Sequence, residues 1–274
     1  MSLAVFGGMP GANAPGTNDF SCKPTAAHPR PVILVHGLLG NRSTNGQTYG
    51  PLLKNNGYCV FALTYGVEYD ITPVDLFGGV DDMRVSARQL KRFVAKVLPS
   101  TGATKVDLVG HSEGTVMPQW YLRFLGGAAK VKNDVGLASA YRGTGIAGAG
   151  QPRRGHPGRR DPPHGLSVVP AVLAVLAVHE EAAPRRHAAA GRDLHQHRDK
   201  VRPAGAAVHQ RHAAGVNQIV LQDVCRQDHS ELFQIVSSRN AAQLVLNALD
   251  PEHPRPIRCS RVLPYVGELL PGLP

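Results

Sequence analysis

The chain has 274 residues, of which 42% are hydrophobic and 18% charged, with 30 Lys and Arg against 20 Asp and Glu. This length and apolar content suffice for one large domain with a full core, and they exclude wholesale disorder. The excess of ten positive charges raises nucleic acid or an anionic surface as a partner. Whether the net charge indicates such a partner depends on where along the chain the charged residues lie.

The positive charge is concentrated in one stretch. Residues 151–212 hold eleven Lys and Arg, five Asp and Glu and eight of the 13 His, and no aromatic residue occurs from Arg142 to Leu232. The arginine pairs have no helical face or interleaved aromatics to bind nucleic acid, and the histidines lack a rigidly held third ligand. We therefore predict a solvated charge run, with no nucleic-acid partner, no metal site and no cofactor.

The start of the chain has no basic residue followed by a long apolar run, so no signal peptide is predicted in it. The cysteines are Cys22, Cys59, Cys225 and Cys259. Because none forms a CxxC or CxxH pair, a zinc site is disfavoured. Two disulfides are allowed, which leaves export from the cell an open question.

The elements alternate between strands and helices over the first half of the chain. Residues 1–28, rich in Gly, Pro, Asn and Ala, predict an irregular arm. The predicted strands are 31–35, 58–63 and 105–109; the predicted helices are 49–54, 79–98, which Pro99 ends, and 116–125. Such alternation favours a parallel sheet with helices on both faces.

The pattern is lost in residues 151–212 and returns with a strand at 216–221 and a helix at 240–249. The Pro-rich tail at 251–274 is expected on the surface. We predict a single α/β domain over 1–274, with a mostly parallel sheet and an anomalous, poorly ordered segment at about 151–212.

A serine lies on the sharp turn between the third strand and its helix. Gly110-His-Ser-Glu-Gly114 fits the pattern Gly-x-Ser-x-Gly, directly after a strand and directly before a helix. This context is that of a nucleophile elbow, in which the turn lifts the serine hydroxyl above the sheet. We predict Ser112 as a nucleophile; the alternative is a Gly-rich turn with a solvent-facing serine.

A second loop follows the first predicted strand. His36-Gly37 there offers a backbone N–H to an oxyanion, so the predicted donors are the N–H groups of Leu38 and Glu113. A loop with a structural histidine is the alternative. Four apolar residues near these loops either line an acyl pocket or simply pack: Leu38, Leu39, Met117 and Trp120.

The sequence resembles the secreted actinobacterial class 2 lipases and esterases of the α/β-hydrolase fold. The resemblance covers roughly 18–148 and 215–258, and is carried by Asn18–Pro24, His36-Gly37, Asn55–Leu63, Gly78-Gly79, Gly110–Gly114, Pro118–Gly127, Val216–Cys225 and Leu244–Asp250. It implies hydrolysis of acyl or lipid esters by a Ser-Asp-His triad, a Cys22–Cys59 disulfide, an extracellular location and transient contact with a lipid interface.

The chain departs from this family at the base and at the acid. The family loop reads like C-P-x-D-x-x-E-H, whereas here it is Cys225-Arg-Gln-Asp-His-Ser-Glu-Leu232, so Leu232 holds the place of the base. His229, the only histidine in this loop, is our predicted base, with a surface histidine as the alternative. Asp223, after the last strand, is the predicted acid.

The family segment that carries the acid is not readable in 151–212. Residues 193–210, back-translated with one base dropped, permit Thr-Tyr-Thr-Asn-Ile-Val-Thr-Lys-Tyr-Asp-Gln-Leu-Val-Arg-Pro-Tyr-Thr-Ser, which matches that segment. We interpret the stretch as a frameshifted translation. The sequence then predicts a serine ester hydrolase impaired by the missing acid or, alternatively, a non-catalytic lipase remnant with a disordered basic insert. Acyl-chain preference and oligomeric state stay open.

Overall fold

A computed structural model of the chain describes residues 12–44, 46–67, 76–139 and 216–263, together with two further strands at 175–179 and 267–268. Apart from the strand at 175–179, the basic stretch at 151–212 lies outside the described residues. So do residues 1–11 of the predicted arm and most of the tail after 263. The described residues 12–28 hold no helix or strand, only a bridge between Thr17 and Val60.

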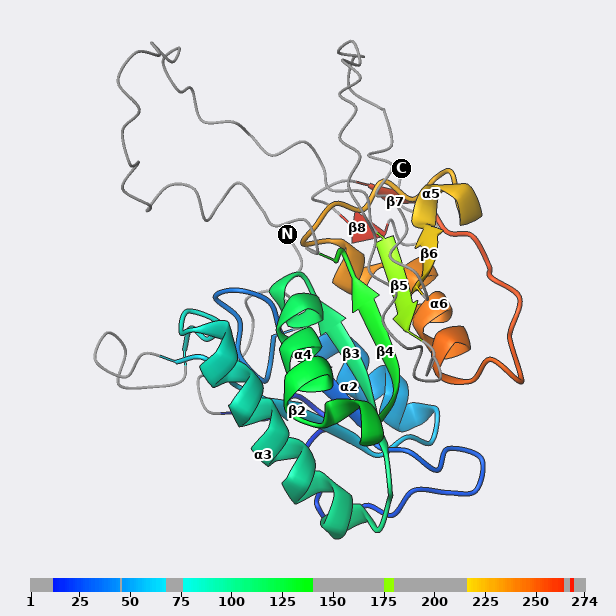
Figure 1. Ribbon diagram of the computed structural model, residues 1–274. Coiled ribbons are helices and arrows are strands. Elements are labelled where there is room, and N and C mark those ends of the chain that lie inside the picture. The colour runs from blue at the N-terminus through cyan, green and yellow to red at the C-terminus, as the bar shows by residue number, and fades with distance from the viewer. Residues whose placement is uncertain are drawn as a thin grey trace, which may run out of the picture.

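One six-stranded sheet forms the centre of the molecule (Figure 1). Its strands are β1 (Val32–Val35), β2 (Val60–Leu63), β3 (Val106–His111), β4 (Val131–Leu137), β5 (Val175–His179) and β6 (Val216–Val220), in the order β2-β1-β3-β4-β5-β6. The first four run parallel, and β5 is antiparallel to both β4 and β6. The predicted, mostly parallel sheet is confirmed.

Helices cover both faces of this sheet (Figure 1). They are α2 (Gly46–Asn55), α3 (Met83–Thr101), α4 (Glu113–Phe124), α5 (Leu221–Val224) and α6 (Arg239–Leu249), with short 3₁₀ turns η1 (Gly127–Ala129) and η3 (Ile235–Ser237). The small strands β7 (Val262–Leu263) and β8 (Gly267–Glu268) pair separately. Helices α3 and α4 pack on one face, and α2 and α6 on the other.

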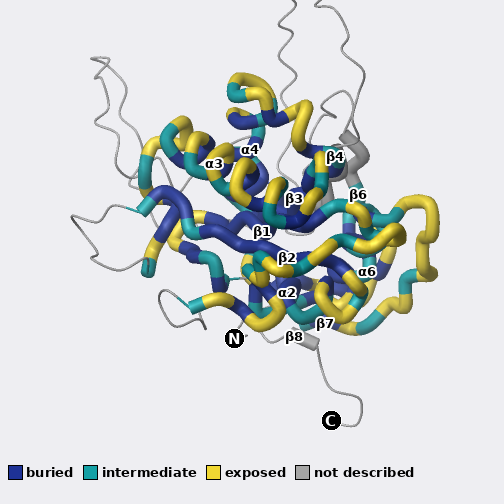
Figure 2. Tube along the Cα trace, turned by 90° about the horizontal axis from the view of Figure 1, so that it is seen from below, coloured by how far each residue is buried: buried dark blue, intermediate teal, exposed yellow. Residues whose placement is uncertain are grey.

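Strand β1 shows how the two faces divide the core. Ile33 and Val35 belong to the cluster with α3 and α4, whereas Val32 and Leu34 belong to the cluster with α2 and α6. All four are buried, so the strand reads as a continuous apolar run, as strands covered on both faces do. Figure 2 shows these buried central strands between outer segments that are largely exposed.

Two sequence predictions about elements need correction. Helix α3 does not end at Pro99: the proline lies in its last turn, and the helix ends at Thr101, where Gly102 caps it at φ 75°. It also begins at Met83 instead of residue 79, because Asp82 is the N-cap and its side chain accepts from the Arg84 N–H. Strand β4 was not predicted at all.

Two disulfides join distant segments of the chain. Cys22–Cys59, expected from the family resemblance, ties the arm to the start of β2, and Cys225–Cys259 ties the segment after β6 to the tail. None of the helices in the described ranges combines the length and apolar character that a membrane crossing requires.

Candidate active site

Ser112 occupies the tight turn between β3 and α4. Its backbone angles are φ 54° and ψ −120°, a left-handed conformation that costs about 1–3 kcal/mol for a residue with a side chain. The Ser112 N–H donates to the carbonyl oxygen of Leu137 at 3.0 Å, which fixes the turn against the end of β4. Helix α4 begins at the next residue. This strand–turn–helix is the predicted elbow.

Two glycines permit the tight packing around the elbow. A Cβ atom on Gly110 would overlap the carbonyl oxygen of Gly114, and a Cβ on Gly114 would overlap the carbonyl oxygens of Val35 and His36. The helix therefore starts directly against the end of β1 as well as β3. Any larger residue at either position would push the serine away from the sheet.

The loop after β1 reaches the elbow. A Cβ on Gly37 would lie 3.1 Å from Ser112 Cβ, so the two turns are in contact. The Leu39 N–H donates to Gly78 O at 2.8 Å, and the Gly78 N–H donates to Gly40 O. In the described part of the chain, no hydrogen bond uses the N–H of Leu38 or of Glu113, the two predicted oxyanion donors.

His36 is held by the segment that follows β2. Its Nε2 accepts from the Tyr65 N–H at 3.2 Å, which leaves Nδ1 as the protonated nitrogen, and Nδ1 donates to Gly37 O at 2.8 Å. The ring stacks on Tyr65 with centroids 4.2 Å apart, and the Tyr65 hydroxyl donates to His36 O at 2.7 Å. The histidine shapes the loop, as in the structural alternative, while Gly37 keeps the loop in contact with the elbow.

The side chain of Glu113 turns from the elbow toward this same loop. Its carboxyl lies near the Tyr65 hydroxyl, and each group shifts the pKa of the other. A Cβ on Gly79 would lie 3.3 Å from Glu113 Oε1 and 3.1 Å from Leu38 Cα. Burial raises the pKa of Glu113 to about 7 and holds the pKa of Tyr65 well above its usual range.

On the other side of the elbow, His111 contacts the loop after β6. Its Nε2 donates to the carbonyl oxygen of Leu232 at 2.8 Å, and burial lowers its pKa to about 4. His111 directly precedes Ser112, so this bond ties the backbone of residue 232 to the elbow segment. The leucine side chain is partly buried and packs against the core cluster shared by β1 and α6.

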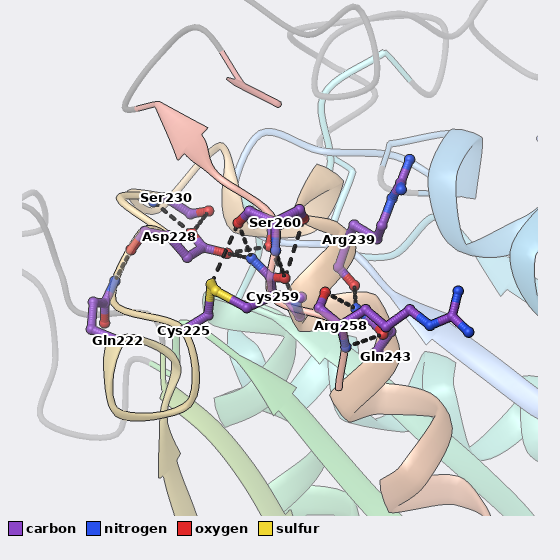
Figure 3. The surroundings of a disulfide bond; sticks show 12 residues. Gln222, Cys225, Asp228, Ser230, Arg239, Gln243, Arg258, Cys259 and Ser260 are labelled. Atoms are coloured by element: carbon purple, nitrogen blue, oxygen red, sulfur yellow. Dashed lines mark hydrogen bonds between the residues drawn. A yellow bond between two sulfur atoms is a disulfide. The ribbon is translucent and has the colours of Figure 1, made fainter. Parts of the chain in front are cut away.

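A buried carboxylate holds the loop that carries Leu232 (Figure 3). Asp228 Oδ1 accepts from the N–H and the hydroxyl of Ser230, and Oδ2 accepts from Ser238 Oγ at 2.6 Å and Asn240 Nδ2 at 2.8 Å. Asn240 also bonds Ser260 beside the Cys225–Cys259 disulfide. The loop is thus tied to α6 and to the tail.

Comparison with known proteins places this arrangement in a family. Residues 29–155 match the family model described as lipase (class 2). This segment, somewhat under half of the chain, is therefore similar to the class 2 lipases. A triacylglycerol lipase of Burkholderia plantarii is 33% identical over 115 residues, which are 42% of this chain and 30% of that protein. Another, of Pseudarthrobacter phenanthrenivorans, is 36% identical over 90 residues, 32% of this chain and 27% of that protein. The matched segments thus span less than a third of either relative.

Solved lipase structures are also similar to the class 2 lipase segment. The mature lipase BlEst2 of Bacillus licheniformis is 23% identical, with a TM-score of 0.38, and the match covers 52% of each chain. Lipase B of Aspergillus fumigatus is 17% identical, with a TM-score of 0.37, over 48% of this chain and 28% of that one.

The structure does not bring the predicted base and acid to the elbow. His229 is exposed, and its N–H donates to Val262 O at 2.9 Å. Asp223 is exposed on α5. Within the described residues, neither side chain hydrogen-bonds the other or Ser112. Their roles stay predictions.

The strand next to β4 also bears on the acid. Because β5 is antiparallel to β4, Leu176 near the start of β5 pairs with Leu137 at the end of β4. His179, at the end of β5, pairs with Asp134, farther from the elbow. The carboxyl end of β5 therefore does not point to the elbow, where an acid on a following loop would be needed. The out-of-frame match at 193–210 lies outside the described residues.

Sequence reasoning missed Asp228 and Tyr65, which shape the two sides of the site. Asp228 was visible as the aspartate of the family loop pattern, but its role is to bind the loop, not a substrate. Of the four apolar residues noted near the site, Met117 is fully buried and packs in the core with α3, whereas Trp120 is exposed and packs on Phe124, with ring centroids 4.5 Å apart.

Exposed apolar side chains border the loop after β1, which carries the predicted oxyanion donor Leu38. They come from two neighbouring segments, joined by the Leu39–Gly78 hydrogen bond. The members are Leu38, Leu39, Phe77, Val80 and Met83. An apolar surface beside a nucleophile suits a substrate with an acyl chain.

Proposed function

We propose that the chain hydrolyses carboxylic esters with acyl or lipid groups, through an acyl-enzyme on Ser112. The observation that carries this proposal is the strained elbow at Ser112, with two backbone N–H groups, of Leu38 and Glu113, left unused beside it. A strained serine backbone persists only where its surroundings enforce it, and here the close-packed glycines do so. The class 2 lipase match supports the same chemistry.

The proposed reaction has two stages. Ser112 Oγ attacks the ester carbonyl carbon while its proton passes to a base, and the Leu38 and Glu113 N–H groups bind the developing oxyanion. The bond to the alcohol then breaks, and the alcohol leaves with that proton. Water attacks the acyl-enzyme in the same way, releases the acid and restores Ser112.

For the base we propose His229, the only histidine between Cys225 and Leu232, with Asp223 as the acid that orients it. Either role requires the loop to move, because both side chains are exposed in the structure. Substituting His229 by Ala and Asp223 by Asn tests these roles separately from that of Ser112.

The apolar side chains beside the oxyanion loop support a lipid substrate and transient contact with a lipid–water interface. The two disulfides support export, because such bonds persist in oxidising surroundings. Faster turnover of a long-chain ester above its solubility limit than below it would support the interface contact.

A second candidate is a non-catalytic lipase remnant. The position of Leu232 favours it, because a leucine stands beside the elbow where the family places its base. Without a base, proton transfer from Ser112 loses a contribution of about 10²–10⁴-fold.

Turnover of p-nitrophenyl butyrate by purified protein distinguishes the two candidates. The hydrolase predicts a steady rate that Ser112→Ala abolishes and Ser100→Ala, in the last turn of α3, does not. The remnant predicts equal background rates for wild type and Ser112→Ala in protein that melts cooperatively.

A further inference from the structure

His111, the residue before Ser112, is a buried histidine that the proposed reaction does not use. Side chains alternate between the two faces of a strand, and Val109, two residues earlier in β3, belongs to the core cluster with α2 and α6. Leu232 packs against that same cluster. The His111 side chain therefore points to the face on which the loop 225–232, hereafter the base loop, lies.

The contact between His111 and the base loop is a directed hydrogen bond. A carbonyl oxygen can only accept, so the 2.8 Å bond to Leu232 O requires a hydrogen on His111 Nε2. Burial lowers the pKa of His111 to about 4, so at neutral pH the ring is neutral and its Nδ1 carries no hydrogen. Protonation at lower pH would add a hydrogen at Nδ1 and leave the one on Nε2. The bond is therefore available over the whole pH range of an esterase assay.

His111 also contacts the loop after β1. A Cβ on Gly37 would lie 3.1 Å from His111 O and 3.3 Å from His111 Nδ1. The imidazole thus has the oxyanion loop at one nitrogen and the base loop at the other. Its backbone is held in the sheet, where His111 pairs with Leu137 of β4. The oxyanion loop, the elbow and the base loop therefore meet at this residue.

We propose that His111 is a positioning residue of the base loop: its Nε2–H holds the carbonyl of residue 232, and thereby the end of that loop, to the segment that carries Ser112. The proposal rests on the proposed function, in which a base on this loop takes the serine proton. A misplacement of about 1 Å can cost a reaction about a hundredfold in rate, so the position of the loop end matters to turnover.

The base loop has an anchor near each end. Near its start, Asp228 accepts from Asn240 Nδ2 at 2.8 Å, which ties the loop to α6. At its end, His111 binds Leu232 O. His229, the proposed base, lies between the two anchors, so the motion that brings its ring to the elbow is a motion of the few residues between them. Without the His111 anchor, that motion would start from a loop end that is no longer bound to the elbow.

Two amide substitutions of His111 separate the hydrogen bond from the packing of the ring. Glutamine carries an N–H at about the place of Nε2, whereas asparagine carries one at about the place of Nδ1, which faces Gly37. We therefore expect His111→Gln to keep the bond to Leu232 O and His111→Asn to lose it. A role in packing alone predicts no such rescue, because both variants lose the ring.

The first measurement does not need turnover. Protein labelled with ¹³C at the leucine carbonyls and ¹⁵N in phenylalanine gives carbonyl–amide NMR signals only for Leu-Phe pairs, of which the chain has two, Leu76-Phe77 and Leu232-Phe233. In His111→Asn we expect an upfield shift of the Leu232 carbonyl carbon and about tenfold faster hydrogen exchange of the Phe233 N–H. In His111→Gln both should stay close to wild type.

The Leu76-Phe77 signal is the internal reference in these spectra. A Leu232 signal that is the same in wild type, His111→Gln and His111→Asn would overturn the proposal. Equal changes in both Leu-Phe signals would mean a general loosening of the fold and would overturn it as well.

The second measurement is kcat and KM with p-nitrophenyl butyrate. We expect kcat to fall about tenfold in His111→Asn at unchanged KM, and to stay within about twofold of wild type in His111→Gln. The matched control is His28→Asn, which replaces a histidine stacked on Tyr58 before β2 and should keep the wild-type kcat. Equal losses of kcat in the two His111 variants would contradict the positioning role.

The two measurements distinguish failure of this proposal from failure of the proposed function. A chain without Ser112-dependent turnover, but with the expected NMR difference between His111→Gln and His111→Asn, would reject the hydrolase and retain His111 as the anchor of the base loop. An active chain in which the two variants behave alike would retain the hydrolase and reject the anchor.

Discussion

The two sides of the elbow are built by different means. On the nucleophile side, meaning β3, Ser112, α4 and the loop 36–40, the groups that would act are a strained serine and two backbone N–H groups held by close contacts of glycines. On the base side, meaning residues 221–240, the loop is held by Asp228 and a disulfide, yet the residue beside the elbow is Leu232.

The nucleophile side depends mainly on backbone conformation, whereas the base side depends on the chemistry of one side chain. Backbone donors need only the right fold, so the geometry of the nucleophile side does not depend on which side chain stands at residue 232. A base needs both the position and an imidazole, and on the base side Leu232 has no imidazole while His229 is exposed away from the elbow. A loop can therefore keep its hydrogen bonds while it loses the group that the reaction requires.

The largest effect is expected from Gly114→Ala, which attacks the nucleophile side directly. The new methyl group would overlap the carbonyl oxygens of Val35 and His36, so we expect a loss of about 3 kcal/mol in the free energy of unfolding and loss of turnover. Urea unfolding measures it. Gly126→Ala, at φ 82° in open space, should cost only about 1 kcal/mol; equal costs would contradict the role given to backbone packing.

The second prediction would remove the contrast between the two sides. Leu232→His places an imidazole on a loop whose carbonyl at residue 232 is already bonded to His111, next to Ser112 in sequence. We expect turnover of p-nitrophenyl butyrate to rise about a hundredfold, equivalent to about 2.7 kcal/mol. Leu232→Gln controls for polarity alone. A rate for Leu232→His no higher than that of Leu232→Gln would mean that residue 232 does not reach the serine.

A third prediction concerns what holds the base side. In Asp228→Asn an amide N–H₂ would face donors such as Ser238 Oγ or Ser230 N–H, which both need an acceptor. We expect a loss of about 2 kcal/mol in the free energy of unfolding. Asp223→Asn, on the exposed helix α5, should change it by less than about 0.5 kcal/mol. Similar losses in the two variants would refute the structural role of Asp228.

The smallest effect concerns pH and the sheet beneath the elbow. Burial raises the pKa of Asp134 to about 7 from 3.8, so the folded state holds a proton that the unfolded chain releases. Stability conferred by that proton is present below about pH 4 and lost as the pH rises to about 7. Asp134→Asn should reduce this fall in the melting temperature by a few degrees. Asp107 and Glu113, with pKa values of about 6 and 7, would account for the part that remains.

Much of the nucleophile side could be predicted from sequence, because its information is local. The apolar runs that became β1 and β2 and the Gly-x-Ser-x-Gly turn each lie within a few residues. Strand β4 was not predicted because Lys132, Asn133 and Asp134 interrupt its apolar pattern. The buried Asp134 is hydrogen-bonded by Gln119 of α4. That bond joins separate elements and leaves no periodic signal.

The base side could be predicted only in part, because its contacts link segments far apart in sequence. The sequence around Asp228 holds no pattern that predicts its bond to Asn240. The sequence around His111 likewise holds none that predicts its bond to Leu232. The family pattern located the loop and the missing histidine. It did not show that the carboxylate at Asp228 would keep the loop in place without that histidine.

Leu232 lies where two demands on the sequence compete. Its side chain packs with residues such as Leu34 and Val245 in a core that elements from both ends of the chain share. An imidazole here would serve turnover but would remove apolar contacts from that core. Leu232→His would therefore exchange apolar core contacts for a titratable ring, and we expect the variant to unfold at a lower temperature than wild type.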